Sequence, residues 1–88
     1  MTYSIAATPG FEKQMRKLDK YTSTMIRAWI TKHLDGCSDP RARGKPLNKE
    51  KSGQWRYRIG DYRLICRIED DRLIIFALEV GHRREIYS

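Results

Sequence analysis

The sequence predicts an α+β domain with the element order β-α-α-β-β-β, in which two N-terminal helices pack on one face of a small antiparallel sheet. Three observations lead to this expectation. Apolar residues recur at helical spacing between residues 11 and 34, and they alternate at strand spacing between residues 54 and 81. The chain has 88 residues, which fits a single domain over 1–88 with a small core.

The first strand and the first helix are expected within residues 3–18. Residues 3–7 alternate weakly between polar and apolar side chains, as strands do. Thr8 is a favourable N-cap and Pro9 suits the first helical position, so we expect the helix to begin there. Its apolar face is expected to consist of Phe11, Met15 and Leu18.

A second helix follows, and a long basic loop separates it from the remaining strands. Thr22 or Ser23 is expected to cap this helix, and Gly36 is expected to end it. Its apolar face is expected to consist of Ile26, Trp29, Ile30 and Leu34. Residues 37–53 contain prolines and glycines and show no periodicity, which predicts a loop of functional importance or mobility.

Three further strands are expected at Gln54–Ile59, Tyr62–Glu69 and Leu73–Gly81. Gly60 and Asp61 between the first two of them fit a two-residue hairpin turn, because glycine readily adopts the positive φ that such turns need. A two-residue turn fixes the register of the hairpin and places Arg58 directly opposite Arg63. Like charges in opposed positions are unfavourable unless another group compensates them.

The next turn is expected to supply that compensation. A three-residue turn at 70–72 pairs Glu69 with Leu73 and Arg63 with Glu79. Glu79 alone would then compensate the positive charges of Arg58 and Arg63.

Side chains alternate across a strand, so each strand divides into two faces. The face expected under the helices consists of Trp55, Tyr57, Ile59, Tyr62, Leu64, Cys66, Ile68, Ile74, Phe76, Leu78 and Val80. The opposite face carries Arg56, Arg58, Arg63, Arg67 and, beyond the last strand, Arg83. These arginines either solvate an open sheet face or bind phosphate. Their convergence favours phosphate, which guanidinium groups bind in pairs of hydrogen bonds while staying charged.

The net charge of +7 is concentrated in one part of the chain. Residues 41–58 hold seven basic side chains and one acidic side chain, whereas the residues before and after them are close to neutral. A concentrated basic segment of this kind predicts an anionic partner, although many such segments are only solvated surface.

The sequence also indicates several features that we do not expect this protein to have. Cys37 and Cys66 are too few for a disulfide scaffold or a four-ligand zinc site, and no glycine-rich phosphate loop precedes a helix, so we expect no metal and no cofactor. No apolar run approaches membrane-spanning length and no secretory signal is visible, which predicts a cytoplasmic protein away from membranes. Trp29 and Trp55 are more typical of a core than of base-stacking platforms.

The segment GQWRYRIGDYRLI, from Gly53 to Ile65, resembles the RelE/ParE superfamily of toxins of type II toxin–antitoxin systems. The ending VGHRREIY, from Val80 to Tyr87, and the upstream segment Gly44–Leu47 are similar to the same superfamily, on its RelE-like branch. The resemblance covers essentially the whole chain. It implies a small microbial ribonuclease fold with two helices against an antiparallel sheet.

The RelE-like resemblance implies a metal-independent endoribonuclease that cleaves messenger RNA in the ribosomal A site. The catalytic roles of the branch map onto Arg56, Arg58, Arg63, Arg83 and Tyr87. Contacts to RNA are expected from Arg41, Arg43, Lys45, Lys49 and Lys51 in the basic loop. Tyr87 is the expected general base, with His82 as the alternative, although strand parity points His82 to the helix-covered face.

The resemblance also implies partners and an alternative function. The ribosome and messenger RNA are expected partners, together with a cognate antitoxin that is acidic and folds on binding. ParE-like members of the superfamily poison DNA gyrase without catalysis, which is the alternative reading. The second strand carries arginine where RelE looks lysine-rich, and arginine does not release a proton near neutral pH.

Overall fold

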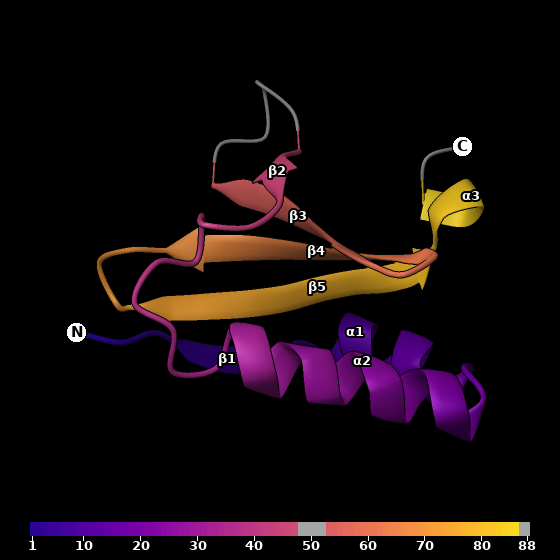
Figure 1. Cartoon of the computed structure of the whole chain (residues 1–88). Coiled ribbons are helices and arrows are strands. Elements are labelled where there is room, and N and C mark those ends of the chain that lie inside the picture. The colour runs from indigo at the N-terminus through magenta and orange to yellow at the C-terminus, as the bar shows by residue number, and fades with distance from the viewer. Residues whose placement is uncertain (48–52, 87–88) are drawn as a thin grey trace.

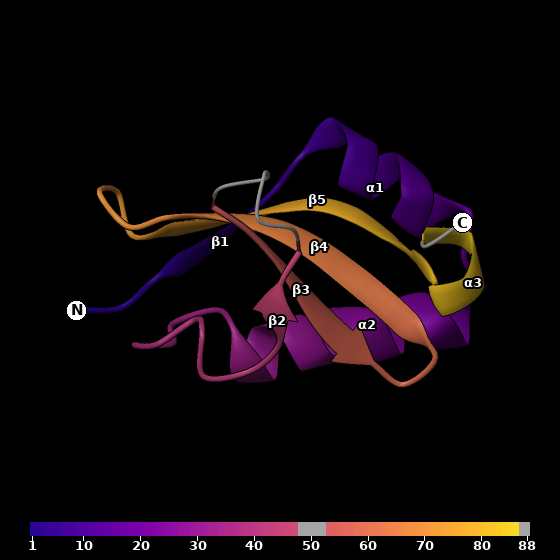
Figure 2. The same ribbon diagram turned by 90° about the horizontal axis from the view of Figure 1, so that it is seen from above.

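The computed structural model describes residues 1–47 and 53–86 and confirms the α+β class. A five-stranded sheet in the order β1-β5-β4-β3-β2 carries α1 and α2 together on one face (Figures 1 and 2). The elements are β1 (Ser4–Ala7), α1 (Pro9–Arg16), α2 (Lys20–His33), β2 (Lys45–Pro46), β3 (Gln54–Ile59), β4 (Tyr62–Glu69), β5 (Ile74–His82) and α3 (Arg83–Ile86).

The sheet differs from expectation in two ways. Strand β1 pairs with β5 in parallel, so the sheet is mixed rather than antiparallel throughout. The loop expected over 37–53 contains the short edge strand β2, which pairs with β3 through Lys45 opposite Arg56 and Pro46 opposite Trp55. Periodicity could not reveal two residues of strand, because alternation needs several residues to show.

Helix α1 forms as the sequence predicts. The hydroxyl of Thr8 accepts a hydrogen bond from the backbone N–H of Phe11 at 3.3 Å, and Pro9 occupies the first helical position. Phe11 and Met15 are buried and Leu18 packs against the core. The amphipathic pattern therefore attaches α1 to the sheet.

Helix α2 begins earlier than the predicted cap at Thr22 or Ser23. Asp19 is the N-cap, and its carboxylate accepts from the backbone N–H of Thr22 at 3.0 Å and from its hydroxyl at 2.6 Å. A carboxylate at this end also interacts favourably with the helix dipole, which explains why Asp19 replaces the hydroxyl caps. Beyond the helix, Gly36 has a φ of +84° and turns the chain as expected.

The β3–β4 hairpin has the predicted register. Gly60 has a φ of +60°, and Arg58 lies opposite Arg63. The two-residue turn leaves no freedom in the pairing of the strands that it joins, so the sequence was sufficient here.

The predicted register of β4 and β5 is wrong. Glu69 pairs with Ile74, because the turn contains four residues and ends with Leu73 at a φ of 54°. A bulge between Ile65 and Cys66 shifts the register again. Two irregularities in succession exceed what alternation alone can predict.

These shifts change which residues of β5 enter the core. Ile75 and Ala77 are buried beneath the helices, whereas Ile74 and Phe76, predicted to lie there, are only partly buried. Phe76 lies opposite Arg67, whose guanidinium carbon is 5.1 Å from the centre of its ring. Val80 is buried as predicted, because the bulge restores the expected parity near the end of β5.

Leu78 was also predicted on the helix-covered face but is only partly buried and lies outside the core cluster. Apart from Ile74 and Phe76, the other predicted core residues belong to the cluster or pack against it. The buried residues that form this cluster are Phe11, Met15, Ile26, Ile30, Leu34, Tyr57, Ile59, Leu64, Cys66, Ile68, Ile75, Ala77 and Val80. Trp29 and Trp55 pack against this cluster and are partly buried. Within the described residues, no helix is long and apolar enough to cross a membrane.

Candidate functional site

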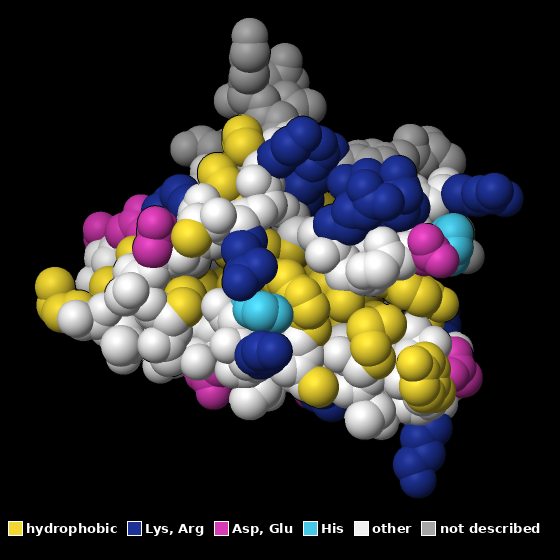
Figure 3. Space-filling view, viewed as in Figure 1, with side chains coloured by type: hydrophobic (Ala, Val, Ile, Leu, Met, Phe, Trp, Pro, Cys, Tyr) yellow, Lys and Arg dark blue, Asp and Glu magenta, His cyan; other side chains and the backbone are white. Residues whose placement is uncertain are grey.

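Four arginines converge on the sheet surface that faces away from the two long helices. Arg56 and Arg58 come from β3, Arg63 from β4, and Arg83 from the start of α3. Figure 3 shows Lys and Arg side chains gathered over β3 and β4, between β2 and α3. Burial lowers the pKa of Arg63, and the positive charges of Arg56, Arg83 and Arg58 lower it further. The four side chains therefore interact electrostatically, and we call them the arginine cluster.

The acidic compensation expected beside this cluster is absent from its predicted place. Arg63 lies opposite Gly81, and Glu79 lies opposite Ile65 instead. The four-residue turn and the bulge each shift the pairing by one residue, and the extra residue of the bulge is Leu78 in β5, so Arg63 no longer faces Glu79. The cluster thus concentrates positive charge, which favours binding of an anion.

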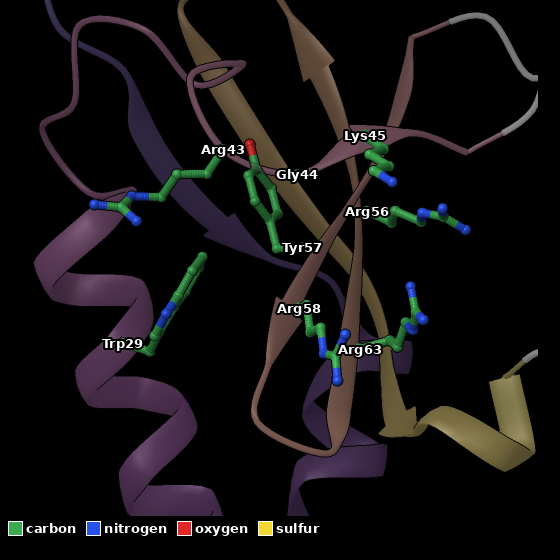
Figure 4. A pocket seen from close by; sticks show the side chains of 8 residues that line it. All are labelled: Trp29, Arg43, Gly44, Lys45, Arg56, Tyr57, Arg58 and Arg63. Carbon is green, nitrogen blue, oxygen red and sulfur yellow. The ribbon is translucent and has the colours of Figure 1, made fainter.

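A cleft of about 360 Å³ opens beside the arginine cluster (Figure 4). Its lining consists of Trp29, Arg43, Gly44, Lys45, Arg56, Tyr57, Arg58 and Arg63. Trp29 and Arg43 lie on one side of the view and Lys45 and Arg56 on the other. Among the described residues, five cationic side chains and no acidic ones line this cleft, so its charge suits a phosphate-bearing ligand.

A second hollow, of about 650 Å³, adjoins the cluster near α3. Asp61, Arg63, His82, Arg83 and Arg84 line it, so Arg63 borders both hollows. The ring of His82 packs edge-on against Tyr62 at 5.5 Å between centroids. The ring therefore contacts the helix-side neighbour that strand parity predicts, and it also borders the hollow that Arg63 and Arg83 share.

The basic loop is fixed to the sheet by two side chains of β3. The hydroxyl of Tyr57 donates to the carbonyl of Pro40 at 2.5 Å, and the indole N–H of Trp55 donates to the carbonyl of Arg43 at 2.6 Å. Burial raises the pKa of Tyr57, so its hydroxyl stays protonated as the donor. These bonds fix the path of the chain that places Arg43 and Lys45 at the cleft.

Gly44 allows this attachment. Its φ is +81°, and a Cβ there would collide with the carbonyl oxygen of Arg56 and lie 2.7 Å from the indole nitrogen of Trp55. Only glycine permits both the backbone conformation and the close approach of the loop to β3.

Arg41 holds the loop rather than lining the cleft. Its guanidinium group pairs with both carboxylate oxygens of Asp70, at 3.0 and 3.1 Å, and lies 5.9 Å from the ring centre of Trp55. Tyr3 donates to the same carboxylate at 2.6 Å, and hydrogen bonds from Arg41 and Tyr3 lower the pKa of Asp70. Arg41 is thus already paired with an acid, and its contact with RNA stays a prediction.

The other residues predicted to contact RNA or to take part in catalysis fall into two groups. Arg43 and Lys45 line the cleft, whereas Lys49, Lys51 and Tyr87 lie outside the described residues. The sequence did not identify Trp29 and Tyr57 as lining residues, because that role depends on how α2 packs beside β3. Among the described side chains, no group of three or more His, Cys, Asp or Glu is placed to hold a metal ion.

The fold defines a class of protein, the small toxins of the RelE/ParE superfamily. A chain of the toxin–antitoxin complex RelBE2 from Mycobacterium tuberculosis matches with a TM-score of 0.83 and 29% identity, over 94% of this chain and 93% of that chain. The isolated RelE toxin of E. coli has the same fold, with a TM-score of 0.73 and 21% identity over 98% and 92% of the two chains.

Sequence comparison gives the family. Toxin RelG of Mycobacterium tuberculosis is 31% identical over 87 residues, which cover 99% of this chain and 98% of that protein. The family model of the ParE toxin of type II toxin–antitoxin systems, parDE, matches residues 5–87. The chain belongs to this ParE toxin family, within the RelE/ParE superfamily that the sequence resemblance indicated.

Proposed function

We propose that this toxin is a ribosome-dependent endoribonuclease that cleaves messenger RNA in the ribosomal A site and so inhibits translation. The arginine cluster is the observation that carries the proposal. Concentrating Arg56, Arg58, Arg63 and Arg83 on one surface is unfavourable electrostatically, and a phosphodiester in the act of cleavage is the ligand that uses such a concentration of charge.

The proposed reaction needs no metal. The RNA 2′-oxygen loses its proton to a base and attacks the adjacent phosphorus, and the bond to the 5′-oxygen breaks. The products are a 2′,3′-cyclic phosphate and a strand with a 5′-hydroxyl, once that oxygen has gained a proton. The positive charges stabilise the pentavalent state, because it carries more negative charge than the substrate.

The arginines take different parts in this proposal. Arg63, together with Arg56 or Arg58, binds the non-bridging oxygens of the scissile phosphate. Arg83 stabilises the pentavalent state and the leaving 5′-oxygen. Arg63 and Arg83 line one hollow and interact electrostatically, which supports their action on the same phosphate.

The general base has two candidates. Tyr87 is the candidate that the resemblance implies. The pKa of a tyrosine is ordinarily near 10, so nearby positive charge would have to lower it for Tyr87 to act as a base near neutral pH. His82 is the alternative. Strand parity alone pointed His82 to the helix-covered face, away from the arginines. Its position beside the hollow that Arg63 and Arg83 line supports a role as the base.

The proposal includes partners and location. The substrate is messenger RNA on a translating ribosome, which places the toxin in the cytoplasm. An acidic cognate antitoxin that folds on binding neutralises it, in keeping with the toxin–antitoxin complex in which the similar chain from Mycobacterium tuberculosis was solved.

A gyrase-poisoning toxin is the second candidate, and the family model that matches, that of the ParE toxin, favours it. A non-catalytic binder uses the basic surface only for contact. Replacing Arg83 alone would then weaken toxicity in a graded manner rather than abolish a cleavage reaction.

Primer extension on messenger RNA from ribosomes engaged in translation tests the proposal. We expect cleavage within the A-site codon by wild-type protein, no cleavage of free RNA, and none with Arg83→Ala. Arg72→Ala is the matched control, because Arg72 pairs with Glu69 at the distant β4–β5 turn and is expected to leave cleavage intact.

Variants Tyr87→Phe and His82→Gln assign the base. The variant that loses cleavage while retaining ribosome binding identifies it. If wild-type protein is toxic and soluble but cleaves nothing on ribosomes, the ribonuclease proposal is wrong. A DNA-damage response in the same cells then indicates gyrase.

A further inference from the structure

The cleft beside the arginine cluster has an aromatic wall that the proposed cleavage chemistry does not use. Trp29 projects from α2 into this cleft, which also contains the cationic side chains of Arg43, Lys45 and Arg58 (Figure 4). Its indole packs against two other rings, with centroids 4.8 Å from that of His33 and 5.7 Å from that of Tyr57. A partly buried ring fixed in this way presents a rigid apolar surface to the cleft.

The cleft exists because the edge of the sheet is short at this point. Strand β2 ends opposite Trp55 and Arg56, so β3 continues towards its turn with no described strand on its outer side. Helix α2 runs beside this open stretch, and the loop before β2 forms the other boundary. The cleft therefore lies between Trp29 on α2 and the cationic side chains of β3.

The combination of side chains restricts the ligand. A free phosphate would contact the cationic side chains and make no use of the indole, while an apolar molecule would make no use of the positive charge in the cleft. Single-stranded RNA carries both features, since each nucleotide joins a phosphate to a flat base that stacks on aromatic side chains. A cleft of about 360 Å³ is at the small end of ligand sites and suits one nucleotide.

We propose that Trp29 is a stacking platform for one unpaired base of an RNA strand whose phosphate is bound by Arg58 and Arg63. Lys45, across the cleft from Trp29, contacts the neighbouring phosphate. The choice of RNA rests on the ribonuclease function proposed above. Trp29 is therefore a binding residue that positions the strand, and it takes no part in proton transfer.

Binding of two matched oligonucleotides tests this platform. The first is a short single-stranded RNA with methylated 2′-oxygens, which 2′-oxygen attack cannot cleave. The second has the same length and charge but lacks bases. Fluorescence anisotropy measures the affinity of purified wild-type protein and of the variants Trp29→Leu, Trp29→Phe and Tyr21→Leu for both.

Trp29→Leu is expected to weaken binding of the base-containing strand roughly tenfold, because it removes one stacked base. Its affinity for the strand without bases is expected to stay within about twofold, since the cations are intact. Trp29→Phe keeps an aromatic face and is expected to bind nearly as wild type. Tyr21 is an exposed aromatic residue on the same helix, outside the cleft lining, so Tyr21→Leu controls for non-specific stacking.

Three outcomes would overturn the platform. They are equal losses for both strands, a loss for Trp29→Phe as large as for Trp29→Leu, and no binding of the base-containing strand by wild-type protein. Thermal unfolding of each variant shows that binding is measured on folded protein. Base-dependent binding through Trp29 without ribosomal cleavage would refute only the ribonuclease proposal, and cleavage without any effect of Trp29→Leu on binding would refute only the platform.

Discussion

Arg58 and Arg63 face each other across the β3–β4 hairpin, and their repulsion is expected to lower the stability of the folded protein while it concentrates positive charge. Both guanidinium groups are cationic, and the positive charge of Arg58 contributes to the lowered pKa of Arg63. Opposed like charges destabilise a sheet, so the arrangement is expected only where a ligand uses it.

Replacing Arg58 by Gln is therefore expected to stabilise the free protein by about 0.2–1 kcal/mol, because it removes the repulsion. The same change is expected to weaken RNA binding, because it removes a cation from the cleft. Urea unfolding and anisotropy measure the two effects on the same samples.

The control for this prediction is Arg72→Gln. Arg72 lies 2.6 Å from a carboxylate oxygen of Glu69, so its removal is expected to lower stability by up to about 1 kcal/mol. Added salt is expected to reduce both differences, since it screens exposed charges. Stability changes of the same sign in the two variants would contradict the repulsion argument.

At the scale of elements, the short strand β2 and the loop before it depend on one glycine. Gly36 and Gly44 both have a positive φ, but the atoms around them differ. A Cβ on Gly44 would meet the backbone of Arg56, whereas a Cβ on Gly36 would meet no atom within 4 Å.

Gly36→Ala is expected to cost about 1 kcal/mol through backbone strain alone. Gly44→Ala is expected to cost about 3 kcal/mol or more, because the collision displaces the loop from β3 as well. It should also weaken RNA binding by moving Arg43 and Lys45 away from the cleft. Urea unfolding and the anisotropy assay distinguish the two variants, and equal effects would show that the close approach at Gly44 is unimportant.

The elements also show what the sequence can predict. The register of β3 and β4 follows from Gly60 and Asp61, because a two-residue turn admits one pairing. The register of β5 does not follow, because Leu73 in the left-handed region and the bulge at Leu78 have no signature in hydrophobic alternation. Consequently the four converging arginines were predictable from parity, and the position of Glu79 was not.

The cleft was less predictable than the arginine cluster. Arg56 and Arg58 reach it from a strand whose faces can be assigned by alternation. Trp29 reaches it because α2 lies beside the open edge of β3, which depends on helix packing and on the early end of β2. Contacts between elements far apart in the chain leave no local pattern in the sequence.

At the scale of the whole molecule, stability is expected to fall at acid pH. Hydrogen bonds from Thr22 lower the pKa of Asp19, those from Arg72 and Arg67 lower that of Glu69, and those from Arg41 and Tyr3 lower that of Asp70. A carboxyl group whose pKa is lowered on folding contributes fully above its unfolded pKa, near 4. This contribution is lost as the pH falls through the lower pKa of the folded state.

Urea midpoints measured from pH 7 down to pH 2 test this expectation. We expect a plateau above about pH 5 and a decline below it. Asp70→Asn should be less stable than wild type on the plateau, and the difference should shrink as the pH falls. A difference that is the same at every pH would show that the Asp70 carboxylate charge does not contribute.

The parallel pairing of β1 with β5 has a consequence for biosynthesis. The first strand of the chain finds its partner only when residues 74–77 have been made, and β4 needs the same strand on its other side. A nascent chain therefore cannot close its sheet until β5 has left the ribosome, and a premature stop before β5 yields a fragment with neither pairing. Truncated products of this gene are expected to be degraded as unfolded chains, and they release no partial toxin into the cell that makes them.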